Sequence, residues 1–506
     1  MQGRSDPNSE LLDATALCRK LVPEGSVEAF LADHRKDLFP DELFEDLFPS
    51  RLGRPSIPAD VVATVMVLQS LEGLSDRDAA RGLTDRISWK VACGLSLDDE
   101  GFDYSVLTYW RARLRGSARP ERIFEAVRDV VRQTGVLKGK TRRALDSTLL
   151  DDAVATQDTV TQLVAQIRKV RRVVPVTQQA HAGAHDYESA GKPLIDWSDP
   201  EARAALVHDL VTDALAVLGA VEPDELDDDQ HDALALLALV AGQDVEQDQD
   251  GRWRIAHQVA KDRVISVVDT ESRHMHKSRS EYRDGYKAHL AVEPETGLVT
   301  AATLTPANAP DGKTGVALLE AEDETLTVLA DGAYGSGETL AALKAAGHRC
   351  AIKPYPTRAA IKGGFGRDDF VVDHDHGEVT CPAGLTVAIN ASGKARFGGR
   401  CSGCPLRSRC TTSSSGRDFF VIPYDRERVV QRVAWRDGVF AAEYRQHRPM
   451  VERSISWLVS RGQRRVRFRG VERNQQGLSM RVAALNLRRL VNLGLVHDGA
   501  WRLAVT

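Results

Sequence analysis

Three acidic residues in different local settings constrain the fold of this chain most strongly. Asp146 lies in the run RALDSTLL and Asp331 follows the run TVLA, so each aspartate interrupts or ends an apolar segment that predicts a strand. Glu452 lies in EYRQHRPMVERSISWLV, where apolar residues recur at helical spacing. Two strands and a helix can bring three carboxylates into one pocket, and carboxylate oxygens are the ligands that hard divalent cations prefer. We therefore predict a two-metal phosphodiester site, with two Mg²⁺ or Mn²⁺ ions held by these three residues.

Each of these acids also has a simpler explanation. Asp331 precedes a Gly-rich turn and the helical segment ETLAALKAAG, so it could merely cap that helix. Asp146 precedes two hydroxyl residues and could form an Asx turn. Glu452 lies four residues after Arg448, which is the spacing of a surface ion pair on one helix face. The local sequence leaves these alternatives open.

Several motifs occur in an order that resembles one known family. They are RPSIPADVVATVMVLQSLEGLSDRDAA, ALDSTLLDDAVATQDTVTQL, DGYKAHLAVEPETGLVTAATLTPANAPD, VLADGAYGSGET, CSGCPLRSRC and RPMVERSISWLVSRGQRRVRFRG. Along nearly its whole length the chain is similar to the DDE transposases of bacterial insertion sequences, within the group typified by insertion sequence 1182. The resemblance implies an α/β fold with an RNase H-like core, whose mixed sheet carries Asp146 and Asp331 and whose later helix carries Glu452.

The resemblance also implies an activity and partners. The expected reaction is metal-dependent cleavage of double-stranded DNA at the inverted repeats of transposon ends, followed by strand transfer into target DNA, with a homodimer as the minimal assembly. The family signature places a tyrosine, an arginine and a lysine around the glutamate. Tyr444 and Arg448 match it loosely, and Arg461 is the nearest cation where the lysine would stand. These three side chains are therefore expected to contact DNA.

Two other functions are compatible with the same residues. The first is an RNase H-like nuclease that cuts DNA without strand transfer. The second is a catalytically silent DNA-binding regulator derived from a transposase, against which the presence of all three acids argues. Joining of cut ends to a target would separate the first alternative from a transposase, and DNA binding without cleavage would support the second.

Charge is segregated along the chain. The net charge is −5, yet residues 443–489 contain twelve arginines and three acidic residues, whereas residues 199–250 contain fifteen acidic residues and one arginine. Local fields matter more for phosphate binding than the total charge, because salt screens distant charges. We predict that an arginine cluster around Phe468 grips a DNA backbone, with a solvated basic face as the alternative. Its members are Arg464, Arg465, Arg467 and Arg469.

The length of 506 residues predicts several domains. Residues 1–135 are expected to be a helical DNA-binding domain. A helix-turn-helix module would present Arg111 and Arg113 to DNA, and a bundle that only supports the catalytic domain is the alternative.

The RNase H-like core is expected over residues 136–354, with a helical insertion at about 155–260. The acidic half of that insertion is either a dimerisation or regulatory arm or a solvent-facing helical pair. A strand is predicted at 264–269, followed by a hairpin of YKAHLAV and LVTAATL around EPETG. Lys287 in this hairpin is a further candidate for DNA contact, although its alternation with apolar residues favours a structural role.

Residues 355–440 are expected to form a β-rich insertion that contains cysteines, and residues 441–506 complete the core. Four thiolates can close a tetrahedral zinc site, and a Cys-x₂-Cys pair has the required spacing. The candidate ligands are Cys381, Cys401, Cys404 and Cys410, with His374 and His376 as substitutes. Free thiols and an iron–sulfur cluster are the alternatives.

Composition places the chain among soluble proteins of the cytoplasm. The sequence has 42% hydrophobic and 27% charged residues, and neither an apolar run of ~18 residues nor a secretory leader is found. An odd number of cysteines, seven in all, argues for a reducing compartment. We expect a cytoplasmic, nucleoid-associated protein with no membrane partner.

Overall fold

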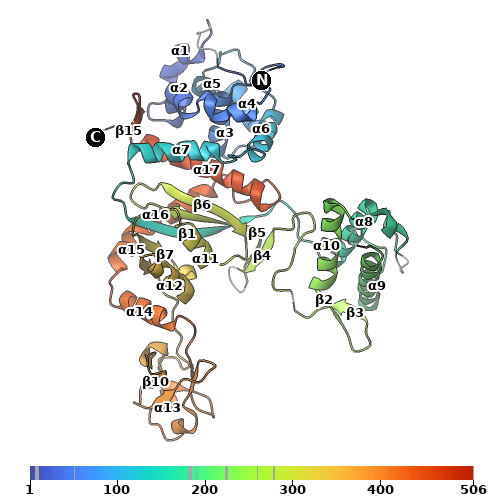
Figure 1. Ribbon diagram of the computed structural model, residues 1–506, viewed down its shortest axis with the longest axis vertical. Coiled ribbons are helices and arrows are strands. Elements are labelled where there is room, and N and C mark those ends of the chain that lie inside the picture. Colours follow the sequence, from blue (N-terminus) through green and yellow to red (C-terminus); the bar gives the residue numbers. More distant parts are fainter. Residues whose placement is uncertain are drawn as a thin grey trace.

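A six-stranded mixed sheet lies at the centre of the computed structural model (Figure 1). The structure describes residues 1–5, 11–50, 52–180, 185–189, 191–222, 226–258, 260–276 and 280–504. The strand order is β4-β5-β1-β7-β8, and β6 pairs with β5. Strand β1 is antiparallel to β5 and parallel to β7, and β7 is parallel to β8. The strands are β1 (Arg142–Asp151), β4 (Arg273–His276), β5 (Tyr282–Val292), β6 (Val299–Pro306), β7 (Thr327–Ala330) and β8 (Arg349–Ile352). This mixed α/β architecture agrees with the predicted fold class.

The hairpin of β5 and β6 confirms one sequence prediction. Gly297 takes a φ of 79° in its turn, and the buried carboxylate of Glu293 accepts hydrogen bonds from the backbone N–H groups of Glu295 and Thr296. A left-handed φ of this kind favours glycine, because a Cβ would crowd the backbone.

The strand predicted at 264–269 is wrong. Val264 and Ile265 are buried, but this segment joins no ladder. The carbonyl of Val264 instead accepts hydrogen bonds from the side-chain amides of Gln162 and Gln243, at 2.8 and 3.1 Å. Side chains of the helical insertion therefore satisfy backbone groups that a neighbouring strand would otherwise pair.

Helices cover both faces of the sheet. On one face, α7 and α17 lie between the sheet and the remaining N-terminal helices (Figure 1). On the other face, α11 and α12 pack against the strands. The N-terminal helices are α1 (Ala14–Cys18), α2 (Val27–Leu38), α3 (Ala59–Glu72), α4 (Asp76–Asp85), α5 (Ile87–Cys93), α6 (Ser105–Arg115) and α7 (Arg122–Thr134). The others are α11 (Asp311–Ala317), α12 (Gly337–Ala345) and α17 (Val471–Asn492).

The N-terminal helices and the sheet share one hydrophobic core. Helix α3 begins after Pro58 and ends at Gly73, which takes a left-handed φ of 70°. Its apolar residues face neighbours on all sides, so the helix is buried almost throughout. The same core cluster contains Val65 of α3, Leu485 of α17 and Leu290 of β5. The larger core of residues 1–135 is therefore continuous with that of the sheet, and a small second cluster around Val91 lies among the N-terminal helices alone.

The helical insertion has its own core beside the sheet (Figure 1). It comprises α8 (Thr159–Val173), α9 (Pro200–Gly219) and α10 (Asp228–Gln243), with a short hairpin of β2 (Val245–Gln247) and β3 (Trp253–Ile255). Asp199 and Asp227 accept hydrogen bonds from the first turns of α9 and α10. Capping and the favourable helix dipole account for part of the acidic charge in this segment.

Short strands and helices follow β8 in the chain. Phe370, Phe397 and Phe419 form the centre of a small core there. The elements are β9 (Val371–Asp373), β10 (Glu378–Thr380), β11 (Thr386–Ala388), β12 (Lys394–Arg396), α13 (Arg407–Cys410), β13 (Asp418–Phe420) and α14 (Asp425–Arg436). The chain ends with α15 (Ala441–His447), α16 (Pro449–Leu458), α17, β14 (Leu495–His497) and β15 (Trp501–Leu503). In the described part of the chain, no helix has the combination of length and apolar character needed to cross a membrane.

Helix α17 covers the outer edge of β6 with polar side chains. Asn486 is 1% exposed, and its amide accepts a hydrogen bond from the Val299 N–H at 2.9 Å and donates one to the Val299 carbonyl at 2.8 Å. Gln475 accepts a hydrogen bond from the Leu304 N–H at 2.7 Å. These contacts replace the missing neighbour strand, so α17 and the sheet are joined by directional bonds as well as apolar packing.

We expect Asn486→Ala to lower the free energy of unfolding by about 2–4 kcal/mol, because both backbone groups of Val299 would stay buried without partners. Chemical denaturation of the full chain would measure the change. Asn492→Ala, at the exposed end of the same helix, is the matched control and should have little effect. Equal effects of the two substitutions would contradict the role of Asn486.

Candidate active site

The sheet register places Asp146 and Asp331 on neighbouring parallel strands. The paired residues of β1 and β7 end at Ala144 and Leu329, and each aspartate lies two residues farther along the chain. Ala144 and Leu329 both face the core shared with α16 and α17, so the period of two puts both aspartates on that face. Neighbouring strands lie about 4.8 Å apart, and the two carboxylates therefore belong to one site.

Arg448 connects this pair of aspartates to the helix that carries Glu452. Arg448 precedes the first residue of α16 and is 4% exposed. Its Nη2 lies 3.0 Å from Asp146 Oδ2, and its Nη1 lies 3.6 Å from a carboxylate oxygen of Glu452. The Glu452 side chain is 62% exposed. The buried guanidinium of Arg448 thus lies between two of the three predicted acids, Asp146 and Glu452.

The charges of this site act on one another. Burial raises the pKa of Asp146, and the charge of Asp331 raises it further, whereas Arg448 lowers it. Burial also raises the pKa of Tyr444, with contributions from Asp331 and Glu452. The Tyr444 ring packs edge-on against Trp435, with ring centres 5.0 Å apart. The tyrosine predicted to contact DNA therefore lies within the field of the same acids.

The simpler roles considered for the acids are also present. Asp331 Oδ1 accepts a hydrogen bond from the Ala333 N–H at 2.9 Å, which caps a short 3₁₀ turn rather than α12. Asp146 Oδ1 accepts one from the Ser147 N–H at 2.9 Å. Each of these bonds uses one carboxylate oxygen and orients its aspartate, and the second oxygen of Asp146 pairs with Arg448.

Sequence reasoning missed a fourth acid, Asp311. It is the first residue of α11, its side chain is 13% exposed, and its Oδ1 accepts a hydrogen bond from Ser147 Oγ at 2.6 Å. Lys287 Nζ lies 3.3 Å from Asp311 Oδ2, and His289 Nδ1 lies 3.7 Å from Oδ1. Asp311 follows the end of strand β6, in TLTPANAPD, much as Asp331 follows β7. That position after a strand is the signal that could have identified it.

Lys287 is buried, which corrects the expectation that it contacts DNA. Its side chain is 3% exposed, and Nζ donates a hydrogen bond to the Ala309 carbonyl at 2.8 Å. His289 on the same face of β5 is fully buried, and its Nε2 lies 2.9 Å from Thr305 Oγ1. Both side chains support Asp311 from inside the protein.

Two parts of the chain match protein-family models. Residues 252–487 match the family model described as "Transposase DDE domain", and residues 17–113 match the model described as "Transposase domain (DUF772)". The two matches support a DDE-type transposase. The first match includes Asp331 and Glu452 but begins after Asp146, and the second spans most of the N-terminal helices. No curated protein and no solved structure matches the chain.

The acids of this site have the right chemistry for divalent cations. Three carboxylates supply the oxygen ligands that Mg²⁺ and Mn²⁺ prefer, and a buried aspartate beside another requires positive charge nearby. Arg448 supplies that charge in this structure. In the described part of the chain, the one group of three metal-type ligands with all atoms within 4.8 Å of one another lies elsewhere, at His34, Asp37 and His497. The three carboxylates are therefore not gathered around one point, and a two-ion site does not require them to be, because different carboxylates can bind different ions.

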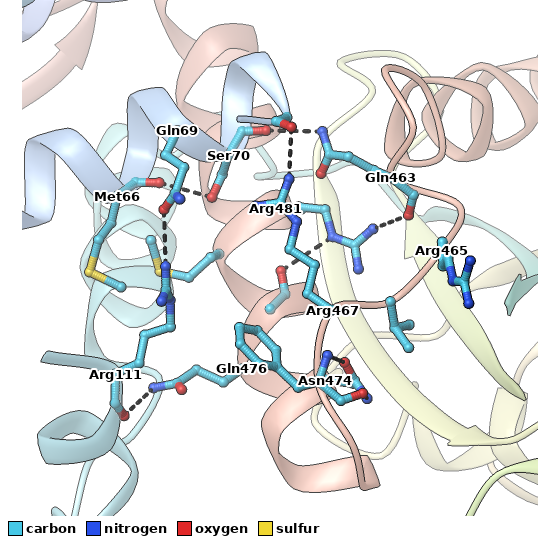
Figure 2. Close-up of a pocket in the computed structure, with 15 residues that line it drawn as sticks. Met66, Gln69, Ser70, Arg111, Gln463, Arg465, Arg467, Asn474, Gln476 and Arg481 are labelled. Atoms are coloured by element: carbon cyan, nitrogen blue, oxygen red, sulfur yellow. Dashed lines mark hydrogen bonds between the residues drawn. The ribbon is translucent and has the colours of Figure 1, made fainter. Parts of the chain in front are cut away.

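Most of the arginines expected to grip DNA contact the protein itself. Figure 2 shows Arg111, Arg465, Arg467 and Arg481 around a cavity of about 70 Å³ between the N-terminal helices and α17. Arg467 donates hydrogen bonds to the Leu74 and Gly73 carbonyls. Arg464 donates to the Leu149 carbonyl in β1, and Arg465 donates to the Asp152 carbonyl directly after it. Burial lowers the pKa of Arg481 to about 10. This basic segment therefore holds the N-terminal helices on the catalytic core.

Arg111 and Arg113 are engaged in the same way. Arg111 forms an ion pair with Asp76 and lies 5.6 Å from the centre of the Phe468 ring. Arg113 lies over Phe48 at 4.8 Å and donates a hydrogen bond to the Leu47 carbonyl at 3.3 Å. These contacts favour the supporting bundle over a helix-turn-helix that presents both arginines. Arg461, Arg465, Arg467 and Arg469 are exposed, and Arg461 also donates a hydrogen bond to the Leu71 carbonyl at 3.0 Å.

The four predicted zinc ligands line one small cavity of about 20 Å³ in the β-rich segment. Burial raises the pKa of Cys410, and the other three thiols add to the shift, against Arg417. In the described part of the chain, no three of the sulfur atoms lie within 4.8 Å of one another. His374 pairs with Asp425 at 3.5 Å and His376 with Asp373 at 2.8 Å, so both histidines are engaged elsewhere.

We expect His289 to make stability depend on pH. Burial, aided by the charge of Lys287 and opposed by Asp311, lowers its pKa from 6.5 to about 4. Between these values the unfolded chain binds more protons, so the free energy of unfolding falls as pH falls from 6.5 to 4, by up to about 3 kcal/mol. Thermal unfolding of the wild type and His289→Gln at several pH values would measure this, with exposed His231→Gln as the control. Parallel pH profiles for wild type and His289→Gln would contradict the expectation.

Proposed function

We propose that this chain is a transposase of the insertion sequence 1182 group that cleaves transposon ends and transfers the cut strand to target DNA. The observation that carries the proposal is the placement of Asp146 and Asp331 on neighbouring parallel strands, with Arg448 lying between Asp146 and Glu452. The two family matches support a DDE-type transposase. Cytoplasmic location near the nucleoid follows from the substrate.

Asp146, Asp331 and Glu452 would hold two Mg²⁺ or Mn²⁺ ions. Divalent ions at such a site lower the pKa of bound water and stabilise the attacking and leaving oxygens of a phosphodiester. The two aspartates are fixed by β1 and β7, whereas Glu452 is mostly exposed and is the ligand that must turn inward. Binding of cations would therefore draw the glutamate towards a preformed pair.

Arg448 would then change its partner. Its Nε and Nη1 have no hydrogen-bond partner among the described residues, although Nη1 lies near Glu452. Once cations balance Asp146, the guanidinium can donate to a phosphate oxygen of the bound DNA. Tyr444 borders the same site, and the exposed Arg461 and Arg469 would contact the flanking backbone. Because both transposon ends must be processed together, we propose a homodimer on DNA.

The β-rich segment is proposed to bind structural zinc through Cys381, Cys401, Cys404 and Cys410. The cavity that the four cysteines share supports this, and Zn²⁺ would have to bring the sulfur atoms to ~2.3 Å from one centre.

A nuclease without strand transfer and a silent regulator remain the alternatives to the transposase. An assay that measures joining as well as cutting of DNA separates all three functions.

Asp331→Asn should abolish cleavage while leaving binding to the transposon ends largely intact, because the amide keeps the shape of the side chain but loses its charge. The assay uses DNA that spans the borders of the encoding gene, with Mg²⁺ or Mn²⁺, and records nicks and joined products. Asp323→Asn, an exposed aspartate in the loop before β7, is the control. Normal cleavage by Asp331→Asn would refute the site.

Asp311→Asn should slow cleavage by about 10–100-fold, as changes to residues that orient metal ligands do. Asp311 holds Ser147, which follows Asp146 in β1, so its loss would misplace that ligand without removing it. Single-turnover cleavage rates compared with wild type and Asp323→Asn would test this. A loss as complete as that of Asp331→Asn would make Asp311 a direct ligand, and an unchanged rate would exclude a positioning role.

A further inference from the structure

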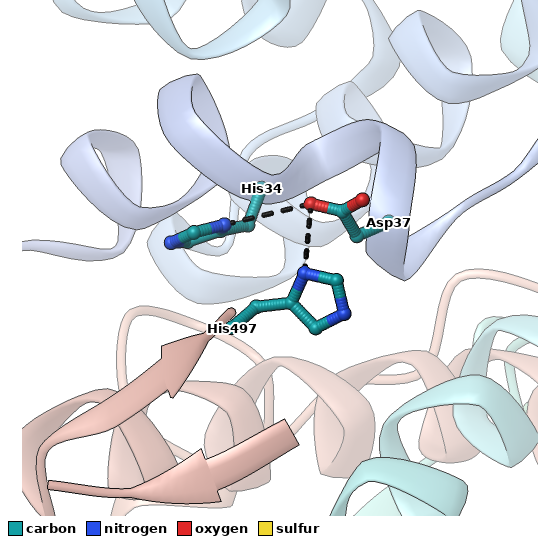
Figure 3. A group of neighbouring side chains, drawn as sticks. All are labelled: His34, Asp37 and His497. Atoms are coloured by element: carbon teal, nitrogen blue, oxygen red, sulfur yellow. Dashed lines mark ion pairs between the residues drawn. The ribbon is translucent and has the colours of Figure 1, made fainter. Parts of the chain in front are cut away.

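A second group of metal-type ligands lies far from the acids, where the two ends of the chain meet. His34 and Asp37 lie on α2, and His497 is the last residue of β14. Figure 3 shows both imidazole rings directed at the same carboxylate. Both Nδ1 atoms lie near one oxygen, Asp37 Oδ2, at 3.5 Å for His34 and 3.2 Å for His497. The described residues contain no other group of three that is this compact.

These distances are those between ligands that share an ion. Zinc binds imidazole nitrogen at about 2.0–2.1 Å and carboxylate oxygen at about 2.0–2.2 Å, so neighbouring ligands of a tetrahedral ion lie roughly 3.3–3.5 Å apart. Hydrogen-bonded histidine–aspartate pairs in this chain are shorter, at 2.6 Å for His274 with Asp284 and 2.8 Å for His376 with Asp373. The spacings at Asp37, 3.2 and 3.5 Å, are therefore wider than these hydrogen bonds and close to the separation of ligands around a common ion.

The surroundings restrict how the ligands can move. His497 packs on Trp501 with ring centres 4.4 Å apart, and His34 packs on Phe30 at 5.1 Å. Phe30 and Trp501 are buried and lie 5.8 Å apart. The two histidine side chains are 24% and 20% exposed, and that of Asp37 is 43% exposed. An aromatic wall thus orients the imidazoles, while solvent can supply a fourth ligand.

We propose that His34, Asp37 and His497 bind a borderline transition-metal ion, with Zn²⁺ as the preferred ion and water as the fourth ligand. Two imidazoles and one carboxylate suit zinc, whereas Mg²⁺ prefers oxygen ligands alone. The site holds the C-terminal hairpin of β14 and β15 against α2. Its role is structural, because it lies apart from Asp146, Asp331 and Glu452 and joins the first domain of the chain to the last strands.

Metal titration of the purified full chain tests the proposal. Excess Mg²⁺ occupies the carboxylate site, and Zn²⁺ binding is then measured for wild type, His34→Gln, His497→Gln and the exposed control His231→Gln. We expect wild type and control to bind one more equivalent of Zn²⁺ than either ligand variant. Wild type should also gain thermal stability on Zn²⁺ addition by an increment that the ligand variants lack.

Cobalt distinguishes this site from the cysteines. Co²⁺ at His34, Asp37 and His497 should give tetrahedral ligand-field bands without a thiolate charge-transfer band. His497→Cys should restore binding and add that band, even if His497→Gln perturbs the hairpin. Equal stoichiometry in wild type and both Gln variants, or cobalt spectra from thiolate sites alone, would overturn the proposal.

Discussion

The structure depends on placing two half-buried aspartates side by side, one of them next to an arginine. Parallel pairing of β1 with β7 fixes Asp146 and Asp331 on one face, and neither strand can shift by one residue without turning its aspartate to the other face. Like charges this close raise the free energy of the folded chain unless a cation lies beside them. Arg448 meets that need from the start of α16, which is why this helix has to lie against β1.

Helix α17 connects the sheet and the helix of Glu452 to the N-terminal helices. One side of the helix bonds to the edge of β6 through Asn486 and Gln475, and the other packs against α3 and α7. Arg481, buried within the helix, donates to the Gln463 carbonyl in the loop after α16. The N-terminal helices, the sheet and the glutamate helix are thus positioned by a single long element.

Local sequence patterns predicted what depends on local chemistry. The hairpin around Gly297, the helix at Glu452 and the strand that contains Asp146 were all anticipated, because turn residues and apolar periodicity specify them. Hydrogen-bond partners supplied by distant parts of the chain could not be predicted in this way. Residues 264–269 have the composition of a strand, yet glutamine side chains of the insertion satisfy them.

The partners of the arginines also could not be predicted from the local sequence. Arg464, Arg465 and Arg467 appear in the sequence as a basic stretch available to phosphate, and only the fold shows which carbonyls they meet. The sequence did not identify Asp311 for a related reason. Its contacts are with Ser147 of β1 and Lys287 of β5, which are distant from it in the chain. Composition alone cannot separate an arginine that binds a ligand from one that binds its own backbone.

The attachment of the helical insertion has an architectural consequence. Asp151 at the end of β1 and Arg273 at the start of β4 are both paired with Gly285 of β5. A Cβ at Gly285 would lie 2.1 Å from the Leu150 carbonyl oxygen, so glycine permits this close junction. The chain therefore leaves the sheet and returns to it within about two strand spacings, roughly 10 Å. A segment attached at so narrow a neck, with a core of its own, is a module that could be lengthened, exchanged or removed while the sheet keeps its register.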